Sequence, residues 1–173
     1  MKVENRNIKY PRIELKTGNL KLILPMDMDY HAMMEKHEEW IKGKENEIKE
    51  AKKTSRNLGL NNRGYHEARE TVKKLVDKYS KEYGLKVNRI TFKNLLSKWG
   101  SCSLQGNLTF NRAISYLPDY NSRYVVFHEM MHLIERKHSL KYWSLVEEKF
   151  PDYKIIEKEL FSYWFLINNK EGI

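Results

Sequence analysis

The feature of this chain that could do chemistry is an H-E-x-x-H sequence that runs from His128 to His132, followed by a third histidine at His138. Residues four apart share one face of a helix, so the imidazoles of His128 and His132 can reach one metal ion. Glu129 flanks that face, where its carboxylate can take a proton from a water molecule on the metal. With 6 His and 18 Glu in 173 residues, chance would produce roughly 0.02 such motifs per chain. The pattern therefore indicates a metal-dependent hydrolytic site.

The residues around the motif predict a buried helix. Tyr124-Val125-Val126-Phe127 precedes it, Leu133-Ile134 follows it, and neither variable position inside it is charged. An apolar arc lies opposite the histidines, which leaves one polar stripe on an otherwise apolar helix. Its members are Val126, Phe127, Met130, Leu133 and Ile134. Such a stripe suits a metal site in a low-dielectric cleft.

A catalytic zinc ion usually has three protein ligands and an open fourth position, so the motif needs one more ligand. His138 is the first candidate for this position. The alternatives are Glu148, twenty residues after His128, and then Glu147, because a carboxylate on the following helix also completes such sites. The ligand types do not separate zinc from iron, cobalt or nickel.

His138 cannot join the site from the same unbroken helix, where it would lie about 9 Å beyond His132 along the axis. The motif helix must therefore end between about Ile134 and Lys137, with the chain turning back. Ser139 is then predicted as the N-cap of a new helix that begins at Leu140. No glycine marks the turn.

Length and composition indicate one globular domain with room for a helical extension. The formal net charge of +9 and the pI near 9.4 favour an acidic partner such as nucleic acid. A solvated lysine-rich surface explains the charge equally well, because the basic residues of segments 42–56 and 69–86 alternate with glutamates.

The single cysteine, Cys102, excludes an internal disulfide and suits a reducing compartment. The first residues contain no apolar core typical of a signal peptide, and no run approaches 18 apolar residues. These features predict a cytoplasmic protein that does not cross a membrane.

The hydrophobic pattern predicts an α+β domain with a small mixed or antiparallel sheet and four or five helices. The H-E-x-x-H motif on one of these helices makes the predicted domain zincin-like. We expect an N-terminal hairpin and charged helix in residues 1–64 and a catalytic core in residues 65–173. The predicted strands lie at 13–15 and 20–24, which form the hairpin, and at 87–92, 98–103 and 107–111. The predicted helices span residues 29–56, 65–83, about 122 onward, 140–149 and 152–168. Gly84 is expected to cap the second helix. An exposed sheet edge beside the metal could hold a peptide as an added strand.

The order of the motifs resembles the YgjP-like metallopeptidase family, which is related to the SprT-like and WLM zinc proteases. The motifs are Lys98-Trp99-Gly100-Ser101-Cys102-Ser103, Gly106-x-Leu108-x-x-Asn111, Tyr124-Val125-Val126-x-His128-Glu129, His138-Ser139, Trp143 and Pro151-Asp152-Tyr153. The resemblance covers residues 65–153 and extends to the N-terminal segment. It implies a zinc-dependent peptidase with the metal ligands His128, His132 and His138 and with Glu129 as the catalytic acid/base.

Two positions depart from the family pattern: Lys98 stands where arginine is common, and Lys137 where asparagine is common. Several further residues near the motifs have possible roles. Trp99 and Trp143 are expected in the core, and Cys102 as a structural residue. Four side chains could stabilise an oxyanion, with no ranking among them. These four are Tyr142, Tyr153, Arg123 and Arg136.

Two rival functions remain open at this stage. A nucleic-acid-binding or scaffold module could keep a structural zinc without catalysis, and the basic charge favours it. The retained Glu129 argues against it, because a structural site needs no general base. The relatives that act on DNA-bound proteins keep nucleic acid among the expected partners by analogy. A metal-dependent hydrolase of a non-peptide amide is the third possibility.

Overall fold

The computed structural model describes residues 2–16, 19–61 and 63–170, which form an α+β structure. The helices and strands group into two compact units. Unit 1 contains the chain up to Leu58 and the segment from Trp164, and unit 2 runs from Gly59 to Tyr163. The division into residues 1–64 and 65–173 stays a prediction. No helix within the described ranges is both long and apolar enough to cross a membrane.

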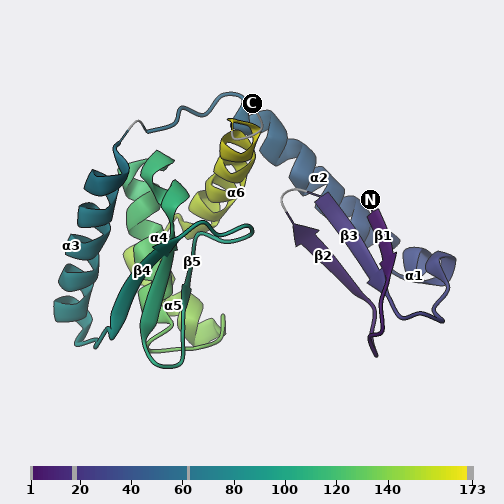
Figure 1. The fold of residues 1–173 in the computed structure, drawn as a ribbon, viewed down its shortest axis with the longest axis horizontal. Helices are drawn as coiled ribbons and strands as arrows, with labels where there is room; N and C mark the ends of the chain where they lie inside the picture. Colours follow the sequence, from purple (N-terminus) through teal and green to yellow (C-terminus); the bar gives the residue numbers. More distant parts are fainter. Residues whose placement is uncertain (1, 17–18, 62, 171–173) are drawn as a thin grey trace. The chain divides into compact units, whose positions relative to one another are not determined.

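Unit 1 has a three-stranded sheet with the strand order β1-β3-β2 (Figure 1). Strand β2 (Arg12–Lys16) is antiparallel to β3 (Asn19–Leu24), which confirms the predicted hairpin. Strand β1 (Lys2–Asn5), which the sequence pattern did not predict, pairs with β3 in parallel. Leu22 and Leu24 of β3 are buried at 0% and 1% exposure, and they form the small core of this sheet.

The charged segment after this sheet forms two helices, so the prediction of one helix over residues 29–56 is wrong. Helix α1 (Tyr30–Lys36) and helix α2 (Glu38–Ser55) meet at His37. The backbone of His37 has φ −120° and ψ 17°, and its N–H bonds to Met34 O at 3.3 Å. This bond spans three residues where an α-helix spans four, which breaks the helical repeat.

The sheet of unit 2 is mixed and has the strand order β4-β6-β5. Strand β4 (Arg89–Lys93) is parallel to β6 (Asn107–Asn111), and β5 (Gly100–Cys102) is antiparallel to β6. The turn between β5 and β6 contains Gly106 at φ +73°, a backbone conformation that glycine adopts at little cost. Leu108 and Phe110 of β6 are fully buried and anchor the core. A short 3₁₀-helix, η1 (Arg112–Tyr116), follows β6.

Helix α4 (Asp119–Met131) is the central element of unit 2 and carries the first four residues of the histidine motif. It contacts α3 (Tyr65–Tyr83), β5, β6 and α5 (Leu140–Lys149) (Figure 1). Helix α6 (Tyr153–Lys170) follows α5 in the chain. Nine of its 13 residues are buried, so the predicted buried helix is confirmed. It begins three residues before the predicted Ser122, because Pro118 and Asp119 already start the first turn.

Aromatic rings hold α4 against its neighbours. The ring of Phe127 lies 5.2 Å from Tyr79, 5.5 Å from Tyr83 and 5.4 Å from Phe150, between centroids. The contacts with Tyr79 and Tyr83 are edge-on, an arrangement that aromatic pairs prefer. One ring of α4 thus contacts both α3 and the residue that caps α5, which fixes the helix that carries the motif.

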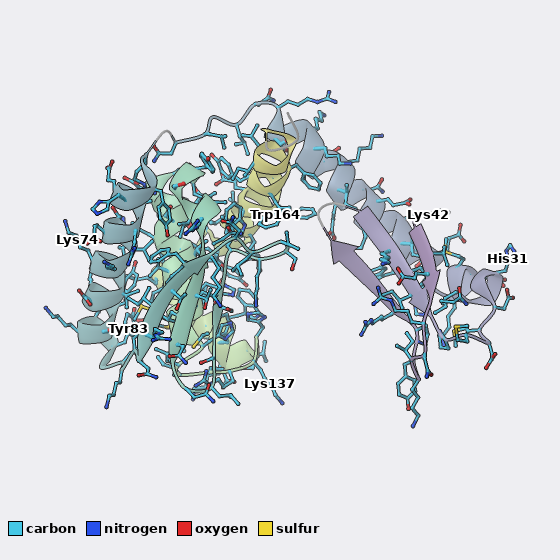
Figure 2. All side chains as sticks on the ribbon, viewed as in Figure 1. His31, Lys42, Lys74, Tyr83, Lys137 and Trp164 are labelled. Atoms are coloured by element: carbon cyan, nitrogen blue, oxygen red, sulfur yellow. The ribbon has the colours of Figure 1, made fainter. Side chains whose placement is uncertain are left out.

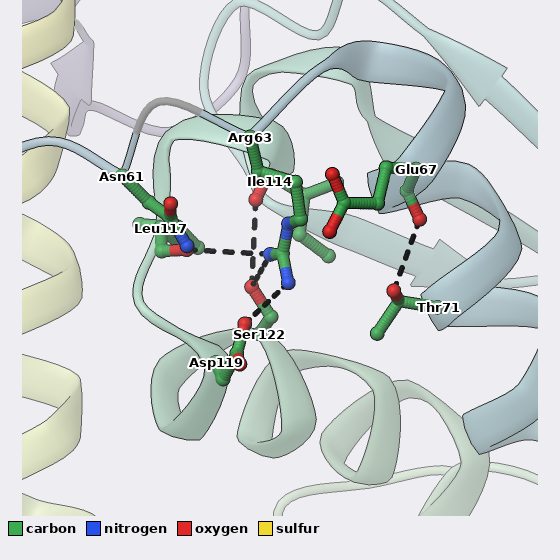
Figure 3. A network of polar contacts seen from close by, with 8 residues as sticks. All are labelled: Asn61, Arg63, Glu67, Thr71, Ile114, Leu117, Asp119 and Ser122. Atoms are coloured by element: carbon green, nitrogen blue, oxygen red, sulfur yellow. Dashed lines mark hydrogen bonds and ion pairs between the residues drawn. The ribbon is translucent and has the colours of Figure 1, made fainter.

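A buried arginine fixes the other end of α4 (Figure 3). Arg63 lies in the segment just before α3, and only 7% of its side chain is exposed. Its guanidinium forms an ion pair with Asp119. It also donates to Ser122 Oγ at 3.1 Å and to Leu117 O at 3.3 Å. The segment before α3 is thereby tied to the first turn of α4, where the carboxylate of Asp119 also complements the helix dipole.

The substitution Gly84→Ala should destabilise the protein by about 1 kcal/mol. Gly84 ends α3 at φ +63°, where an L-residue is strained, although no atom lies within 4 Å of the added methyl. Urea denaturation measures the change. Gly59→Ala is the matched control, because Gly59 has open space around it and no positive φ. Equal denaturation midpoints for the two variants would contradict the assigned role of the cap.

Candidate metal centre

The motif histidines lie where helix α4 ends. The last residue of the helix is Met131, and His132 is its C-cap. The helix therefore ends three residues before Ile134, the earliest end predicted from the sequence. The next two amides each donate to the carbonyl three residues earlier. Leu133 N bonds to Met130 O at 2.9 Å, and Ile134 N bonds to Met131 O at 3.0 Å. These tight three-residue bonds close the helix without glycine, and the chain is then free to fold back toward the motif.

The returning loop brings His138 to the two motif histidines. His138 Nε2 lies 3.2 Å from His128 Nε2 and 3.1 Å from His132 Nε2. Nitrogen ligands at about 2.05 Å from a tetrahedral zinc ion lie about 3.3 Å apart. Within the described part of the chain, these three residues are the only group found with the spacing for one metal ion. The donor set therefore fits zinc in both type and separation.

The electrostatic environment keeps the two motif histidines, His128 and His132, neutral. Burial, together with His132 and His138 nearby, lowers the pKa of His128 to about 3. Burial also lowers the pKa of His132. Neutral imidazole is the form that binds a metal, so no proton has to leave these two rings at neutral pH before an ion enters.

The two motif histidines have different partners at Nδ1. His132 Nδ1 lies 3.1 Å from the main-chain oxygen of Glu135. His128 Nδ1 lies 3.4 Å from the hydroxyl of Tyr124, one turn earlier on α4. A partner at Nδ1 directs Nε2 toward the metal, so both rings are oriented by the residues behind them.

Tyr142 supports the same two rings from α5. Its side chain is fully buried, stacks on His132 with 4.7 Å between centroids, and donates from its hydroxyl to His128 O at 3.0 Å. Since that hydroxyl is engaged inside the protein, it is poorly placed for the oxyanion role considered from the sequence. The start of α5 is as predicted, because Ser139 Oγ accepts from Tyr142 N at 3.3 Å.

A further aromatic ring, Trp143, lies against His138, and Tyr153 lies against Trp143. The ring centroids of Trp143 and His138 are 5.3 Å apart, with 30° between the ring planes. Tyr153 stacks on Trp143, with 4.9 Å between centroids and 19° between planes. Both aromatic residues are half-buried, so Trp143 lies at the border of the core and the site. Lys137, the residue before His138, is exposed (Figure 2).

Glu129 lies on the other flank of the motif, against the sheet. It is 7% exposed, and burial raises its pKa to about 7, although the charge of Lys98 acts in the opposite direction. A methyl group built on Gly100 of β5 would lie 2.6 Å from Glu129 Cγ and 2.8 Å from its Oε1. The missing side chain at Gly100 is therefore what makes room for this carboxylate.

Arg136 connects the histidine loop to the β5–β6 turn. Its guanidinium donates to Ser103 O at 2.7 Å and Leu104 O at 3.0 Å, and it lies 3.5 Å from Cys102 Sγ. With two main-chain carbonyls as acceptors, Arg136 acts as a clamp between loop and turn. Burial raises the pKa of the Cys102 thiol, which fits the structural role predicted for it.

The structure leaves the other candidate ligands outside the cluster and gives roles to residues to which the sequence assigned none. Glu147 and Glu148 are exposed on α5 and do not belong to the histidine group. The residues that gain a role are Gly100 as a contact of Glu129, and Tyr124 with Glu157 behind His128. The position of Tyr124, four residues before His128, was a usable helical signal. Glu157 lies in a charged segment of α6 that resembles any solvated face.

A family model identifies the class of protein to which the chain belongs. The sequence model of the YgjP-like metallopeptidase domain matches residues 58–163, and the chain belongs to this family. It is therefore a metallopeptidase, a hydrolase that acts on peptides or proteins. No curated protein matches the chain.

Two of the solved structures to which the chain is similar are metallopeptidase zymogens. One is the metallopeptidase zymogen of Pyrococcus abyssi abylysin, with 24% identity, 53% of this chain and 93% of that chain covered, and a TM-score of 0.49. The other is the metallopeptidase zymogen of Methanocaldococcus jannaschii jannalysin, with 19% identity, 51% and 90% coverage, and a TM-score of 0.44. The family assignment rests on the family model alone.

The substitution Gly100→Ala should lower peptidase turnover by about 100-fold, because a shift of about 1 Å in a reacting group has an effect of this size. The added methyl would overlap the Glu129 carboxylate while leaving the histidines in place. Peptidase assays and bound-metal analysis measure the two effects separately. Ser101→Ala on the same strand is the control and should retain both properties. Wild-type turnover in Gly100→Ala would contradict the assigned contact.

Proposed function

We propose that the protein is a zinc-dependent endopeptidase in which His128, His132 and His138 hold the metal and Glu129 is the general base. The observation that carries this proposal is the convergence of three Nε2 atoms, with 3.1 and 3.2 Å between the pairs that include His138. The donor set of three imidazoles leaves a fourth coordination position open, as in catalytic rather than structural zinc sites.

The chemistry divides between the metal and Glu129. When bound, zinc polarises a carbonyl oxygen and makes a water molecule more acidic. Glu129 then accepts a proton on its carboxylate and delivers it to the leaving amine. Burial disfavours the charged form of Glu129 and raises the pKa of its carboxyl, which helps the group to take up a proton and hold it until the leaving amine accepts it.

The peptide substrate is proposed to lie along β5. Within the described residues this strand pairs only with β6, so its other edge has unpaired main-chain groups. Gly100 of β5 is in contact with Glu129. An extended peptide added to this edge would place its backbone beside the general base, and main-chain hydrogen bonds would supply binding without a strong sequence preference.

Glu129→Gln should keep the metal but lower turnover by about 100- to 10,000-fold, because the amide cannot accept the proton. The side-chain shape is retained, so folding should change little. Peptidase assays and metal analysis of the same preparations provide the test. Glu148→Gln is the matched control and should keep both metal and activity, since Glu148 is exposed on α5. Wild-type turnover in Glu129→Gln would refute the mechanism.

Removal of the metal should abolish activity and lower thermal stability. Zinc at 100 times its dissociation constant should add about 2.7 kcal/mol to the free energy of unfolding. Thermal denaturation before and after chelation, followed by titration with zinc, iron, cobalt and nickel, measures the gain and identifies the metal that restores turnover. In His132→Ala the zinc-dependent gain should disappear. A full gain in that variant would remove His132 from the proposed ligand set.

Binding of nucleic acid through the basic surface stays a prediction. Several lysines on the helices have acidic partners, as in the ion pairs Lys42–Glu38, Lys73–Glu70 and Lys149–Glu82, whereas Lys74 is exposed on α3 (Figure 2). This pairing favours a solvated face. Electrostatic DNA binding would weaken steeply as salt rises, so an affinity independent of salt would exclude that role.

A further inference from the structure

The Nδ1 atom of His128 faces a pair of side chains whose role is not explained by metal binding alone. This atom lies 3.4 Å from Tyr124 Oη and 3.6 Å from Glu157 Oε1. On the opposite side of the same ring, Nε2 points to His138. An imidazole that offers the lone pair of Nε2 to a metal carries its proton on Nδ1 and needs an acceptor there.

Tyr124 has the geometry and the protonation state to be this acceptor. Its side chain is 1% exposed, and its hydroxyl donates to Glu157 Oε1 at 2.5 Å. A phenol keeps its proton at neutral pH. Because that proton is directed to Glu157, a lone pair of the phenol oxygen remains to accept from His128 Nδ1–H.

The other motif histidine does not depend on such side chains. His132 Nδ1 faces the main-chain oxygen of Glu135 at 3.1 Å, which no substitution removes. His128 is oriented at Nδ1 by two side chains from different helices, Tyr124 on α4 and Glu157 on α6. Its orientation is therefore the one that side-chain substitutions can disturb.

We propose that Glu157, acting through Tyr124, holds His128 in the tautomer that presents Nε2 to the metal. The chain of hydrogen bonds runs from His128 Nδ1–H to Tyr124 Oη and from Tyr124 O–H to Glu157 Oε1. Glu157 and Tyr124 are positioning residues in this scheme. The inference rests on the proposed function, in which His128 is a metal ligand.

The first test measures zinc affinity by competition with a chromophoric chelator. Tyr124→Phe and Glu157→Gln should each weaken zinc binding by about 10- to 100-fold, the usual effect of losing the partner behind a metal-bound histidine. The double variant should bind zinc as tightly as the single variant with the lower zinc affinity, because either change alone already interrupts the relay. Fully additive losses would overturn the relay.

Glu159→Gln is the matched control on the same helix. Glu159 accepts from Asn121 Nδ2 at 3.0 Å, so it also connects α6 to α4, and glutamine can keep that bond. We expect zinc affinity within twofold of wild type. An equal loss in Glu159→Gln would assign the effect to helix contacts in general and overturn the proposal. Unchanged affinity in both Tyr124→Phe and Glu157→Gln would overturn it as well.

The second test needs no variant to bind metal. Nitrogen NMR of the histidine side chains in the metal-free protein should find His128 with its proton on Nδ1, and Tyr124→Phe should shift the population toward Nε2–H. A wild-type ring with its proton on Nε2 would overturn the relay. The proposed function fails separately, if wild type binds no zinc or if His128→Ala binds zinc as tightly as wild type.

Discussion

Three imidazole nitrogens held close together are the constraint on which unit 2 depends. Imidazole rings whose lone pairs converge can share one cation. The protein keeps His138 Nε2 within 3.2 Å of both motif histidines. This arrangement requires α4 to end at Met131, since a longer helix would carry the third ring away along its axis. The buried helix and its aromatic neighbours fix the positions of the first two rings.

The support around the site comes from elements far apart in sequence. Tyr142 of α5 stacks on one histidine and bonds to the carbonyl of another. Phe127 contacts rings on α3 and next to α5, and Arg63 fixes the first turn of α4. Each contact restricts the same helix. Because protein interiors are closely packed, a small displacement of α4 would have to move several aromatic rings together. The packing therefore limits how far the distances between the histidine nitrogens can vary.

The sequence predicted the parts of the structure that depend on local chemistry. The motif helix, the Ser139 cap and the left-handed Gly84 follow from short-range rules and are present. The early end of α4 has no glycine or proline to mark it, and the break at His37 is equally unmarked. The parallel pairing of β1 with β3 joins distant residues, and no local pattern reveals it.

The surroundings of the site were less predictable than the motif. Gly100 matters because a strand passes close to Glu129, 29 residues later in the chain, and only the tertiary arrangement shows this. Glu157 lies among exposed charged residues of α6, and its closeness to His128 depends on how that helix packs. Tyr124 was visible as part of an apolar segment, but its hydroxyl partner was not. Motifs thus identify reacting groups more readily than the residues that orient them.

The hydrogen bonds of Arg136 couple the loop that contains His138 to the β5–β6 hairpin. A single guanidinium bonds to two carbonyls of the β5–β6 turn, and the loop it belongs to carries His138, two residues later. Planar, forked donors of this kind tolerate little change in angle. Turns at the surface usually accept insertions freely, but this one is coupled to the third imidazole. Its length should therefore be held fixed during evolution more strictly than its exposed position suggests.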